Sequence, residues 1–432
     1  MLNYIKLLWL RLIGIDIVEV FSLNALATLI RMLAGMLSVK VVAVIIGPSG
    51  IALLGQLNSF CTIVLGLANG GISSGITKYV AEYKEDSNHV KALLSNAFIV
   101  TMVCSLITGL FLVAGCQYLS QLLFLADNYS YVFVVFGFTI IFFSLNNLLI
   151  SILNGYKQFK RYVKVNIVGT IVGLAYSIIL VTTSGLPGAM INAVTFQSIM
   201  FFVTLWMCRK MPWMKRTFFL GKYNSTIVRK YLGYSLMTLT SLALLPSCQM
   251  FLRGYVITEL TAVDAGIWEG MNRISSMYLS VITTALSIYY LPRMSEIEDP
   301  RDLHNEIFRC YKIVVPMLLA ICIAIFLLRF HVLWLLFTPD FYSMEKLFGW
   351  QLAGDLIKIC SWMLSFLMVA KAKTTLFIST EIFFNITYLG LSFIFLQFNG
   401  VVGLTQGYLC NYIIYLIAMI FFFRNIIRIK TT

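Results

Sequence analysis

The stretch LNALATLIRMLAGMLSVKVVAVII, residues 23–46, is long and apolar enough to cross a membrane as a helix. About 20 such residues span a hydrocarbon core of about 30 Å. Two basic residues, Arg31 and Lys40, interrupt the stretch. A cation at the bilayer centre costs about 2.5–3.5 kcal/mol. The stretch therefore predicts a membrane fold together with a polar environment inside it.

Comparable stretches recur along the whole chain. Of its 432 residues, 60% are hydrophobic, well above a soluble domain, and the mean hydropathy is +0.88. We expect an all-α integral membrane protein with twelve transmembrane helices. The expected spans are centred near residues 23–46, 51–77, 93–115, 131–153, 164–183, 187–208, 232–257, 266–291, 312–330, 346–370, 374–397 and 401–423.

The distribution of basic residues predicts the orientation. Most of the 32 Lys and Arg residues fall in the terminal segments and in the connections on the same side as the termini. The positive-inside rule then places both termini in the cytoplasm. The net charge of +14 is a signal of topology, and its spread over many short segments argues against a nucleic-acid partner.

Short motifs repeat at half the chain length and predict the domain organisation. The offset is 215 or 216 residues for three pairs: Gly50-Ile51 with Gly266-Ile267, Lys157 with Lys373, and Gly185-Leu186-Pro187-Gly188 with Gly400-Val401-Val402-Gly403. Two six-helix halves related by a pseudo-two-fold axis along the membrane normal explain this, with a substrate site between them. We expect an N-terminal interfacial segment (1–22), a first half (23–208), a basic cytoplasmic linker (209–231), a second half (232–423) and a cytoplasmic tail (424–432).

The sequence offers little material for catalysis. The three histidines are dispersed, the nine cysteines lack metal-ligand spacing, and glycine-rich phosphate motifs do not occur. We expect no catalytic residue, no metal site and no cofactor, hence a transporter and not an enzyme.

The basic residues inside the expected spans are the candidate binding residues. Arg31 and Lys40 have no acid within helical reach, which favours anion binding. They lie nine residues apart, on opposite faces of an ideal helix, and share one cavity only if the helix bends, for example near Gly35. Arg253 lies close to the outer end of its span, so that snorkelling to the interface and a role in binding are equally compatible with its position.

Two further cations have acids on the same helix. Glu269 and Arg273 are four residues apart, and Asp355 and Lys358 are three apart. Each pair is either self-neutralising or part of a binding site. Glu381 is a further acid inside a span.

Several motifs, in order, resemble the Wzx flippases of the multidrug/oligosaccharidyl-lipid/polysaccharide exporter superfamily, and within them the lipid III flippase type. The resemblance begins near residue 22 and covers almost the whole chain. Its motifs are Gly47-Pro48-Ser49-Gly50, Thr77-Lys78-Tyr79-Val80-Ala81, Gly266-Ile267-Trp268-Glu269-Gly270, Leu291-Pro292, Trp350-Gln351-Leu352-Ala353-Gly354-Asp355-Leu356-Ile357-Lys358 and Ala370-Lys371-Ala372.

The resemblance implies a protein of the bacterial inner membrane that moves an undecaprenyl-diphosphate-linked oligosaccharide from the cytoplasmic to the periplasmic leaflet. The repeat unit is of the O-antigen type or of the enterobacterial common antigen (lipid III) type. It also implies the phospholipid bilayer, a polysaccharide polymerase and chain-length proteins as partners. Arg31, Lys40, Arg253 and the pair Asp355/Lys358 match family positions, whereas Arg273 and Ser276 depart from the lipid III pattern and make the cavity more cationic.

Physical chemistry supports this class of substrate. Each sugar hydroxyl left unpaired in hydrocarbon costs about 4–8 kcal/mol, so the headgroup needs a polar path, and a diphosphate pairs well with Arg and Lys. Outward movement of an anion gains about 2.3 kcal/mol per charge per 100 mV. We expect the membrane potential to drive part of the transport, with Asp355 or Glu381 as proton-responsive groups.

Other classes remain open at this point. A cation-coupled multidrug exporter of the same superfamily needs buried carboxylates, but the acids of the first half lie in loops or before the first span. A membrane polysaccharide polymerase would carry a large periplasmic loop, for which this chain has no room. A passive scaffold would not explain Arg31 and Lys40.

Overall fold

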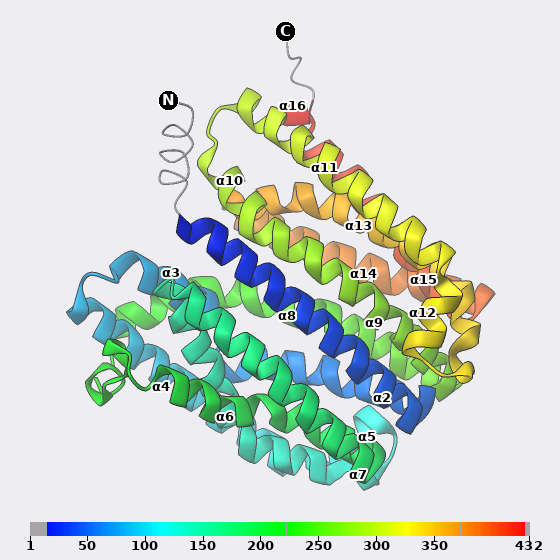
Figure 1. Ribbon diagram of the computed structural model, residues 1–432, viewed down its shortest axis with the longest axis horizontal. Coiled ribbons are helices and arrows are strands. Elements are labelled where there is room, and N and C mark those ends of the chain that lie inside the picture. Colours follow the sequence, from blue (N-terminus) through cyan, green and yellow to red (C-terminus); the bar gives the residue numbers. More distant parts are fainter. Residues whose placement is uncertain (1–14, 222, 372, 428–432) are drawn as a thin grey trace. The chain divides into compact units, whose positions relative to one another are not determined.

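The computed structural model describes residues 15–221, 223–371 and 373–427, in which all regular structure is helical (Figure 1). The expected segments 1–22 and 424–432 fall partly outside these residues. The elements are α2 (Ile15–Ala68), α3 (Ser73–Tyr83), α4 (Ser87–Ala114), α5 (Cys116–Phe124), η1 (Asp127–Tyr129), α6 (Ser130–Gly155), α7 (Phe159–Cys208), η2 (Pro212–Met214), η3 (Arg216–Phe218), α8 (Ser225–Glu259), α9 (Ala262–Ala285), η4 (Leu286–Tyr290), α10 (Leu291–Glu296), α11 (Pro300–Leu327), α12 (Arg329–Leu336), η5 (Pro339–Met344), α13 (Glu345–Ala370), α14 (Thr374–Asn399), α15 (Val401–Phe422) and α16 (Arg424–Ile427).

Many of these helices are membrane-spanning in length and composition. Within the described residues, 8 helices are long and apolar enough to cross a bilayer, or 9 when the bent helix α8 is taken as one span. The protein is therefore an all-helical, multi-pass membrane protein. Two of the spanning helices, α2 and α7, are each interrupted at a glycine with positive φ: Gly47 (φ 65°) and Gly185 (φ 58°).

The break in α7 makes it a helical hairpin. Tyr176 and Thr195, on either side of the break, join their hydroxyl groups at 2.9 Å, and a Cβ on Gly173 would meet the ring of Phe196. The chain therefore folds back at Gly185, between the expected spans 164–183 and 187–208. Glycine serves here because its missing Cβ permits positive φ, and Pro187 is tolerated because it begins the returning helix.

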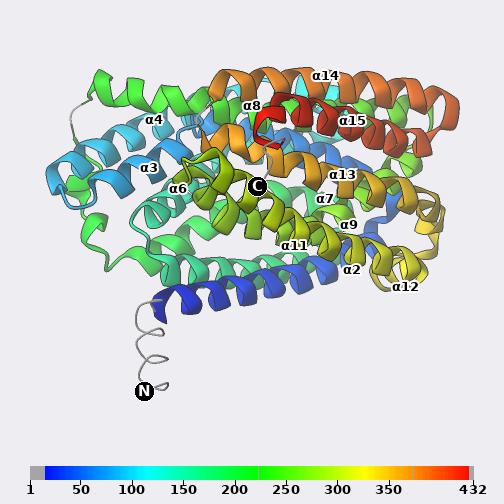
Figure 2. The ribbon, with the colours of Figure 1, turned by 90° about the horizontal axis from the view of Figure 1, so that it is seen from above.

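The turn between α14 and α15 has the same local geometry, and the two helices lie side by side in both ribbon views (Figures 1 and 2). Gly400 has φ 57° and ψ −143°, close to the φ 58° and ψ −131° of Gly185. Three residues later, a Cβ on Gly188 would strike the carbonyl oxygen of Leu180, and one on Gly403 would strike that of Phe395. The repeated sequence motif thus corresponds to a repeated hairpin turn.

Helix α2 differs from one expectation. Its one interruption with non-helical φ and ψ is at Gly47, not near Gly35, where a bend was the condition for Arg31 and Lys40 to share one cavity. Gly47 is followed by Pro48, which cannot donate the hydrogen bond that would continue the helix. The span expected at 51–77 also ends early, since Gly70 and Gly71 adopt φ of 60° and 65° between α2 and α3.

The chain divides into two compact units. Among the described residues, unit 1 comprises 15–38 and 64–239, and unit 2 comprises 39–63 and 240–427. Helices α2 and α8 therefore contribute to both. Residues 39–63, which the sequence places in the first half, cluster with the second unit.

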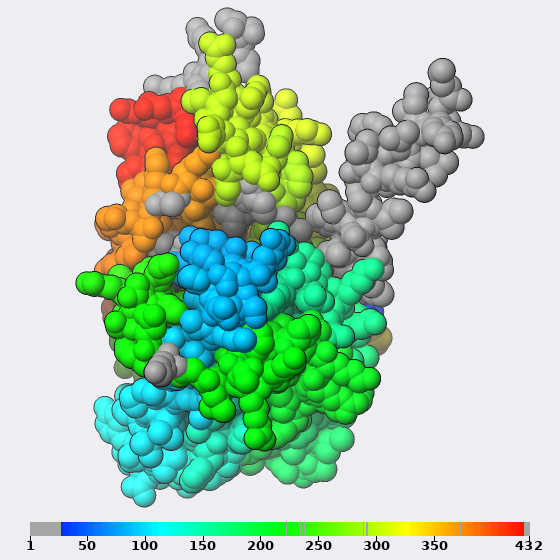
Figure 3. Space-filling view, turned by 90° about the vertical axis from the view of Figure 1, so that its left-hand side faces the viewer, coloured from blue at the N-terminus to red at the C-terminus, as the bar shows by residue number. Residues whose placement is uncertain are grey.

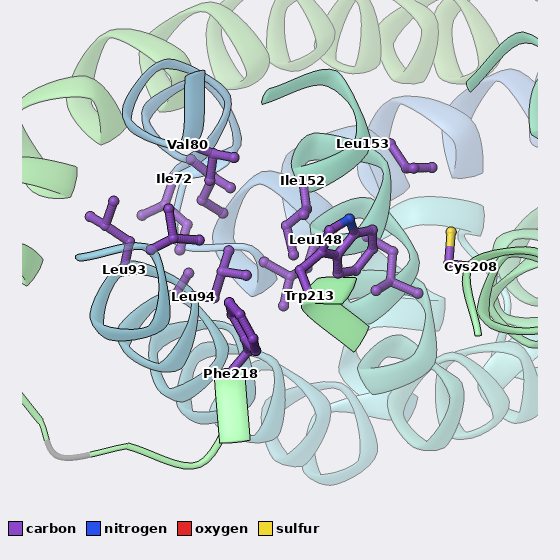
Figure 4. Close-up of a cluster of buried hydrophobic side chains, with 14 of the residues drawn as sticks. Ile72, Val80, Leu93, Leu94, Leu148, Ile152, Leu153, Cys208, Trp213 and Phe218 are labelled. Carbon is purple, nitrogen blue, oxygen red and sulfur yellow. The ribbon is translucent and has the colours of Figure 1, made fainter. Parts of the chain in front are cut away.

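A hydrophobic cluster in unit 1 joins α3, α4, α6 and the segment after α7 (Figure 4). Trp213 is 2% exposed and Phe218 9%, and both side chains point towards Leu94 and Leu148. Tyr231 of α8 donates a hydrogen bond to the carbonyl of Leu93 at 3.1 Å. The basic segment after α7, expected as a linker, is thereby fastened to unit 1.

The end of unit 1 where this segment lies is also rich in basic and aromatic side chains. Figure 3 shows α3 and the beginning of α4 beside the green segment around residues 209–221 on one face. The ammonium of Lys230 lies 5.9 Å from the rings of both Tyr79 and Tyr83. Such cation–π contacts hold α8 against α3.

Candidate functional site

A polar cavity of about 530 Å³ lies in unit 1, between α2, α6 and the two helices of α7. Its polar lining comes from every one of these helices, and α2 contributes Arg31 and Ser38 on one face. Among the described residues that line it, Arg31 alone is charged. The polar lining residues are Arg31, Ser38, Asn146, Tyr162, Asn166, Thr170, Ser177, Asn192, Gln197 and Thr204.

Several polar atoms of this lining are buried without a hydrogen-bond partner among the described residues: Asn146 Oδ1, Asn192 Oδ1 and Thr204 Oγ1. The amide nitrogen of Asn146 donates to Gln197 Oε1 at 2.9 Å, so that its oxygen stays free to accept. Each buried acceptor left unpaired costs about 1–3 kcal/mol. The cavity is therefore built to receive hydrogen-bond donors alongside an anion at Arg31.

Arg31 was predicted as a binding residue from the sequence, whereas the uncharged polar residues around it were not. A signal was present, because Tyr162, Asn166 and Thr170 are spaced four apart in an apolar span, and Gly173 and Ser177 continue the same face. Glycines at 169 and 173 keep this face open, since a Cβ there would meet Met200 or Phe196. The polar face of α7 could be predicted from this spacing. That the face lies opposite Arg31 of α2 could not, because it depends on how the helices pack.

Lys40 belongs to unit 2 and is not among the residues that line the Arg31 cavity of unit 1. Its ammonium donates to the carbonyl oxygens of Trp334 at 2.8 Å and Phe337 at 2.6 Å, at the C-terminal end of α12. Unpaired carbonyls at a helix C-terminus favour a cation. Lys40 was ranked with Arg31 for want of an acid on its own helix; its partners are instead backbone oxygens distant in sequence.

Arg253 is also held by protein groups. It is 1% exposed, and its guanidinium donates to Glu269 at 2.6 Å, Gln56 at 3.2 Å and Ser59 at 3.3 Å. Snorkelling to the interface is therefore wrong for this residue. The reason is that α2 and α9 bring polar side chains to it within the protein.

Glu269 pairs with two arginines in this cluster. Besides Arg253, it accepts from Arg273 at 3.4 Å, the ion pair expected from their spacing. Gly55 makes room for the carboxylate, since a Cβ there would lie 2.5 Å from Glu269 Cδ. With all groups ionised, the cluster carries one net positive charge.

Asp355 and Lys358 do not form the ion pair that their spacing allowed; both are described, and their charged groups do not approach within 4.0 Å. The fully buried Asp355 accepts from Ser275 at 2.5 Å, Tyr408 at 2.7 Å and also from Tyr278. The Lys358 ammonium instead lies 4.8 Å from the Trp362 ring. Hydroxyl groups on α9 and α15 donate to the Asp355 carboxylate, and the long lysine side chain turns towards aromatic rings.

Glu381 lines a small cavity of about 50 Å³ in unit 2. Aromatic residues surround it, among them Trp362, Tyr408 and Tyr412, whose rings also face the Lys358 ammonium at 4.8–5.5 Å. This aromatic cage was not predicted from the sequence, because its rings come from α13 and α15 and meet only in the folded chain. Among the described residues, no group of three His, Cys, Asp or Glu side chains is placed to hold a metal ion.

Comparison with known proteins gives three findings. A family model described as polysaccharide biosynthesis protein matches residues 17–298. The lipid III flippases of Escherichia coli (strain K12) and Shigella flexneri are each 26% identical over 392 residues, covering 91% of this chain and 94% of theirs. An inward-facing multidrug resistance MATE family transporter of the MOP superfamily has a similar fold, with a TM-score of 0.75 at 15% identity over 94% of this chain and 100% of that one.

Proposed function

The chain belongs to the polysaccharide biosynthesis protein family, and from that premise we propose that it is a flippase for undecaprenyl-diphosphate-linked oligosaccharides. It moves the repeat unit from the cytoplasmic to the periplasmic leaflet of the bacterial inner membrane, for cell-surface polysaccharide synthesis. The relatives named lipid III flippase support this substrate class. The repeat unit is of the O-antigen or lipid III type.

The Arg31 cavity is the observation that carries the proposal. A guanidinium can pair with the oxygens of a diphosphate through charge-assisted hydrogen bonds. Sugar hydroxyls can donate to the unpaired oxygens of Asn146, Asn192 and Thr204. The volume of about 530 Å³ falls within the range of about 300–1,000 Å³ typical of ligand pockets. Binding in such a cavity replaces the water that the headgroup loses.

The other candidate site residues have different proposed roles. Arg273 is 18% exposed at its side chain, so it is the second candidate for contact with the headgroup. Lys40 and Arg253 are occupied by protein oxygens, which favours roles in structure. Lys358 and Glu381 flank the aromatic cage; with Asp355, they are the groups through which we propose that protons or the membrane potential act.

For the architecture, we propose twelve spans in two six-helix halves that work by alternating access, with both termini in the cytoplasm. Twelve spans are obtained when α2 and α7 each count as two, because each is divided at a glycine. The other eight are α4, α6, α8, α9, α11, α13, α14 and α15. The matching turns at Gly185 and Gly400 support the internal repeat. The halves are residues 23–208 and 232–423, joined by the basic segment 209–231, with 1–22 as an interfacial segment and 424–432 as a tail.

A second candidate is a cation-coupled multidrug exporter, which the likeness in fold to a MATE transporter accommodates. The buried Asp355 and the Glu381 cage would then bind the coupling ion or a cationic drug. The charge of the unit 1 cavity opposes this reading, because Arg31 repels cations. We further propose a polysaccharide polymerase and chain-length proteins as partners downstream of the flippase.

Translocation in proteoliposomes tests the proposal directly. An undecaprenyl-diphosphate oligosaccharide is incorporated, and its exposure to an external glycosidase is followed. Arg31→Ala should slow translocation about tenfold or more, since a hydrogen bond to a charged group contributes about 1.5–3 kcal/mol, and Arg31→Lys should retain part of the rate. Arg301→Ala, which removes the same charge from an exposed helix start, is the control. Equal rates for folded Arg31→Ala and wild type would disprove the role of the cavity.

A further inference from the structure

Unit 1 has a second hollow, an apolar groove of about 390 Å³ formed by α4, α6, α7 and the segment after α7. Its lining is aliphatic and aromatic except at one position, Arg216. Phe98, Leu148, Phe201 and Phe219 represent the apolar walls. A groove with this lining suits a hydrocarbon chain, and a single cation at its edge suits an anionic headgroup.

The position of Arg216 follows from how its segment is fastened. Trp213 and Phe218 are buried in the core of unit 1, while Phe219 packs edge-on against Phe98 of α4 at 5.8 Å between ring centres. Arg216 lies between the two buried anchors and is exposed. Among the described residues it forms no ion pair. Its guanidinium is therefore presented at the edge of the groove and available to an anion.

The groove is separate from the Arg31 cavity, although α6 and α7 line both. On α6, Asn146 faces the cavity and Leu145 the groove, about 100° apart on the helix. On α7, Thr204 and Leu205 divide in the same way. A ligand in the groove therefore contacts the helices that shape the polar cavity without entering it.

We propose that this groove binds one anionic phospholipid of the cytoplasmic leaflet, with an acyl chain in the groove and its phosphate at Arg216. Hydrocarbon gains little by leaving the bilayer for an apolar groove, so the charge of the headgroup supplies the selectivity. Basic pockets between membrane helices on the cytoplasmic side are known to hold such headgroups. The proposed function places the diphosphate of the flipped lipid at Arg31 in the separate cavity, so a phosphate bound at Arg216 belongs to a different molecule.

The bound lipid positions α6 and α7, and hence the polar side of the cavity. It packs along Leu145 and Leu148 of α6 and along Phe201 and Leu205 of α7. An unfilled groove leaves these side chains without contacts on that side, which permits the helices to shift. Anionic lipid should therefore raise the occupancy of the cavity by its own ligand.

Native mass spectrometry of the full chain with phosphatidylglycerol tests the site without any transport reaction. Arg216→Gln should weaken the first phosphatidylglycerol bound about fivefold, the loss of one Arg contact near a membrane surface. Lys215→Gln, an exposed neighbour that does not line the groove, should leave it unchanged. Zwitterionic phosphatidylcholine should show no such difference between the two variants.

A groove-filling variant, Leu205→Trp, gives an independent test with Arg216 intact. It should abolish the retained lipid, while circular dichroism and the unfolding temperature show that the chain is folded. Equal effects of Arg216→Gln and Lys215→Gln would overturn the site. Retention of undecaprenyl phosphate in place of phosphatidylglycerol would overturn the assigned occupant. These measurements need no translocation, so their outcome is independent of whether the proposed flippase activity is confirmed.

Discussion

Replacing Glu269 with glutamine should strongly destabilise unit 2. The carboxylate is shared by Arg253 and Arg273, and the side chains of Glu269 and Arg253 are only 11% and 2% exposed. Water therefore screens this pair little. Removing one partner of a buried ion pair costs about 3–5 kcal/mol, because the other charge stays buried and uncompensated. We expect that loss for Glu269→Gln.

The same cluster predicts a much smaller loss for Arg273→Gln. Its contact with Glu269 is longer, at 3.4 Å, and its side chain is 18% exposed. A helical pair four residues apart contributes about 0.2–0.5 kcal/mol. Glu269 keeps its shorter bond to Arg253 in this variant. The structure therefore predicts an asymmetry of several kcal/mol between the two ends of one cluster.

The free energy of unfolding in mixed micelles, measured by denaturing-detergent titration, checks these values. Glu296→Gln is the matched control, because it removes the same charge from an exposed pair with Arg293 at 3.7 Å and should cost at most about 1 kcal/mol. The double variant Glu269→Gln, Arg253→Gln should lose less than the sum of the single losses. A loss below about 1 kcal/mol for Glu269→Gln, or equal losses for Glu269→Gln and Arg273→Gln, would refute the reasoning.

Three further outcomes follow from single contacts. Lys40→Met should lower the free energy of unfolding by about 1 kcal/mol, through loss of the carbonyl contacts at the end of α12, and leave headgroup binding by the purified protein unchanged. Gly403→Val should prevent folding, because its Cβ would strike a backbone oxygen, and size-exclusion chromatography should show a loss of monodisperse protein. Gly390→Ala should be tolerated, because nothing lies within 4 Å of its Cβ. Asp355→Asn should cost about 1–3 kcal/mol in the same unfolding titration, since an amide nitrogen would face hydroxyl donors.

Hydropathy and local sequence motifs predicted much of the helical fold. The long apolar runs predicted the spanning helices, and the glycine motif at 185–188 predicted a turn with its equivalent at 400–403, since helix length and positive φ are local properties. Boundaries were less accurate where paired glycines ended a helix inside an apolar run, as at Gly70 and Gly71. The hydrophobicity there continues although the backbone turns.

Helical spacing was a weaker guide to the partners of the buried charges. Spacing allowed an ion pair in both cases. Glu269 pairs with Arg273 four residues along the same helix, whereas hydroxyl groups from other helices donate to Asp355 in place of Lys358. Helical reach is a necessary condition for such a pair, and tertiary partners decide whether it forms.

By itself, the sequence determined that this is an all-helical membrane protein with basic residues inside its spans, since the free energies of burying apolar and charged groups depend on residue type and local period. The tertiary structure decided what each cation does. Arg31 lines a polar cavity with unpaired oxygens, Lys40 binds the end of α12, and Arg253 holds Glu269. A charge in an apolar span must find a partner, and that partner often lies on another helix, from 16 residues away for Arg253 and Glu269 to 297 for Lys40 and Phe337, which only folding brings within hydrogen-bond distance.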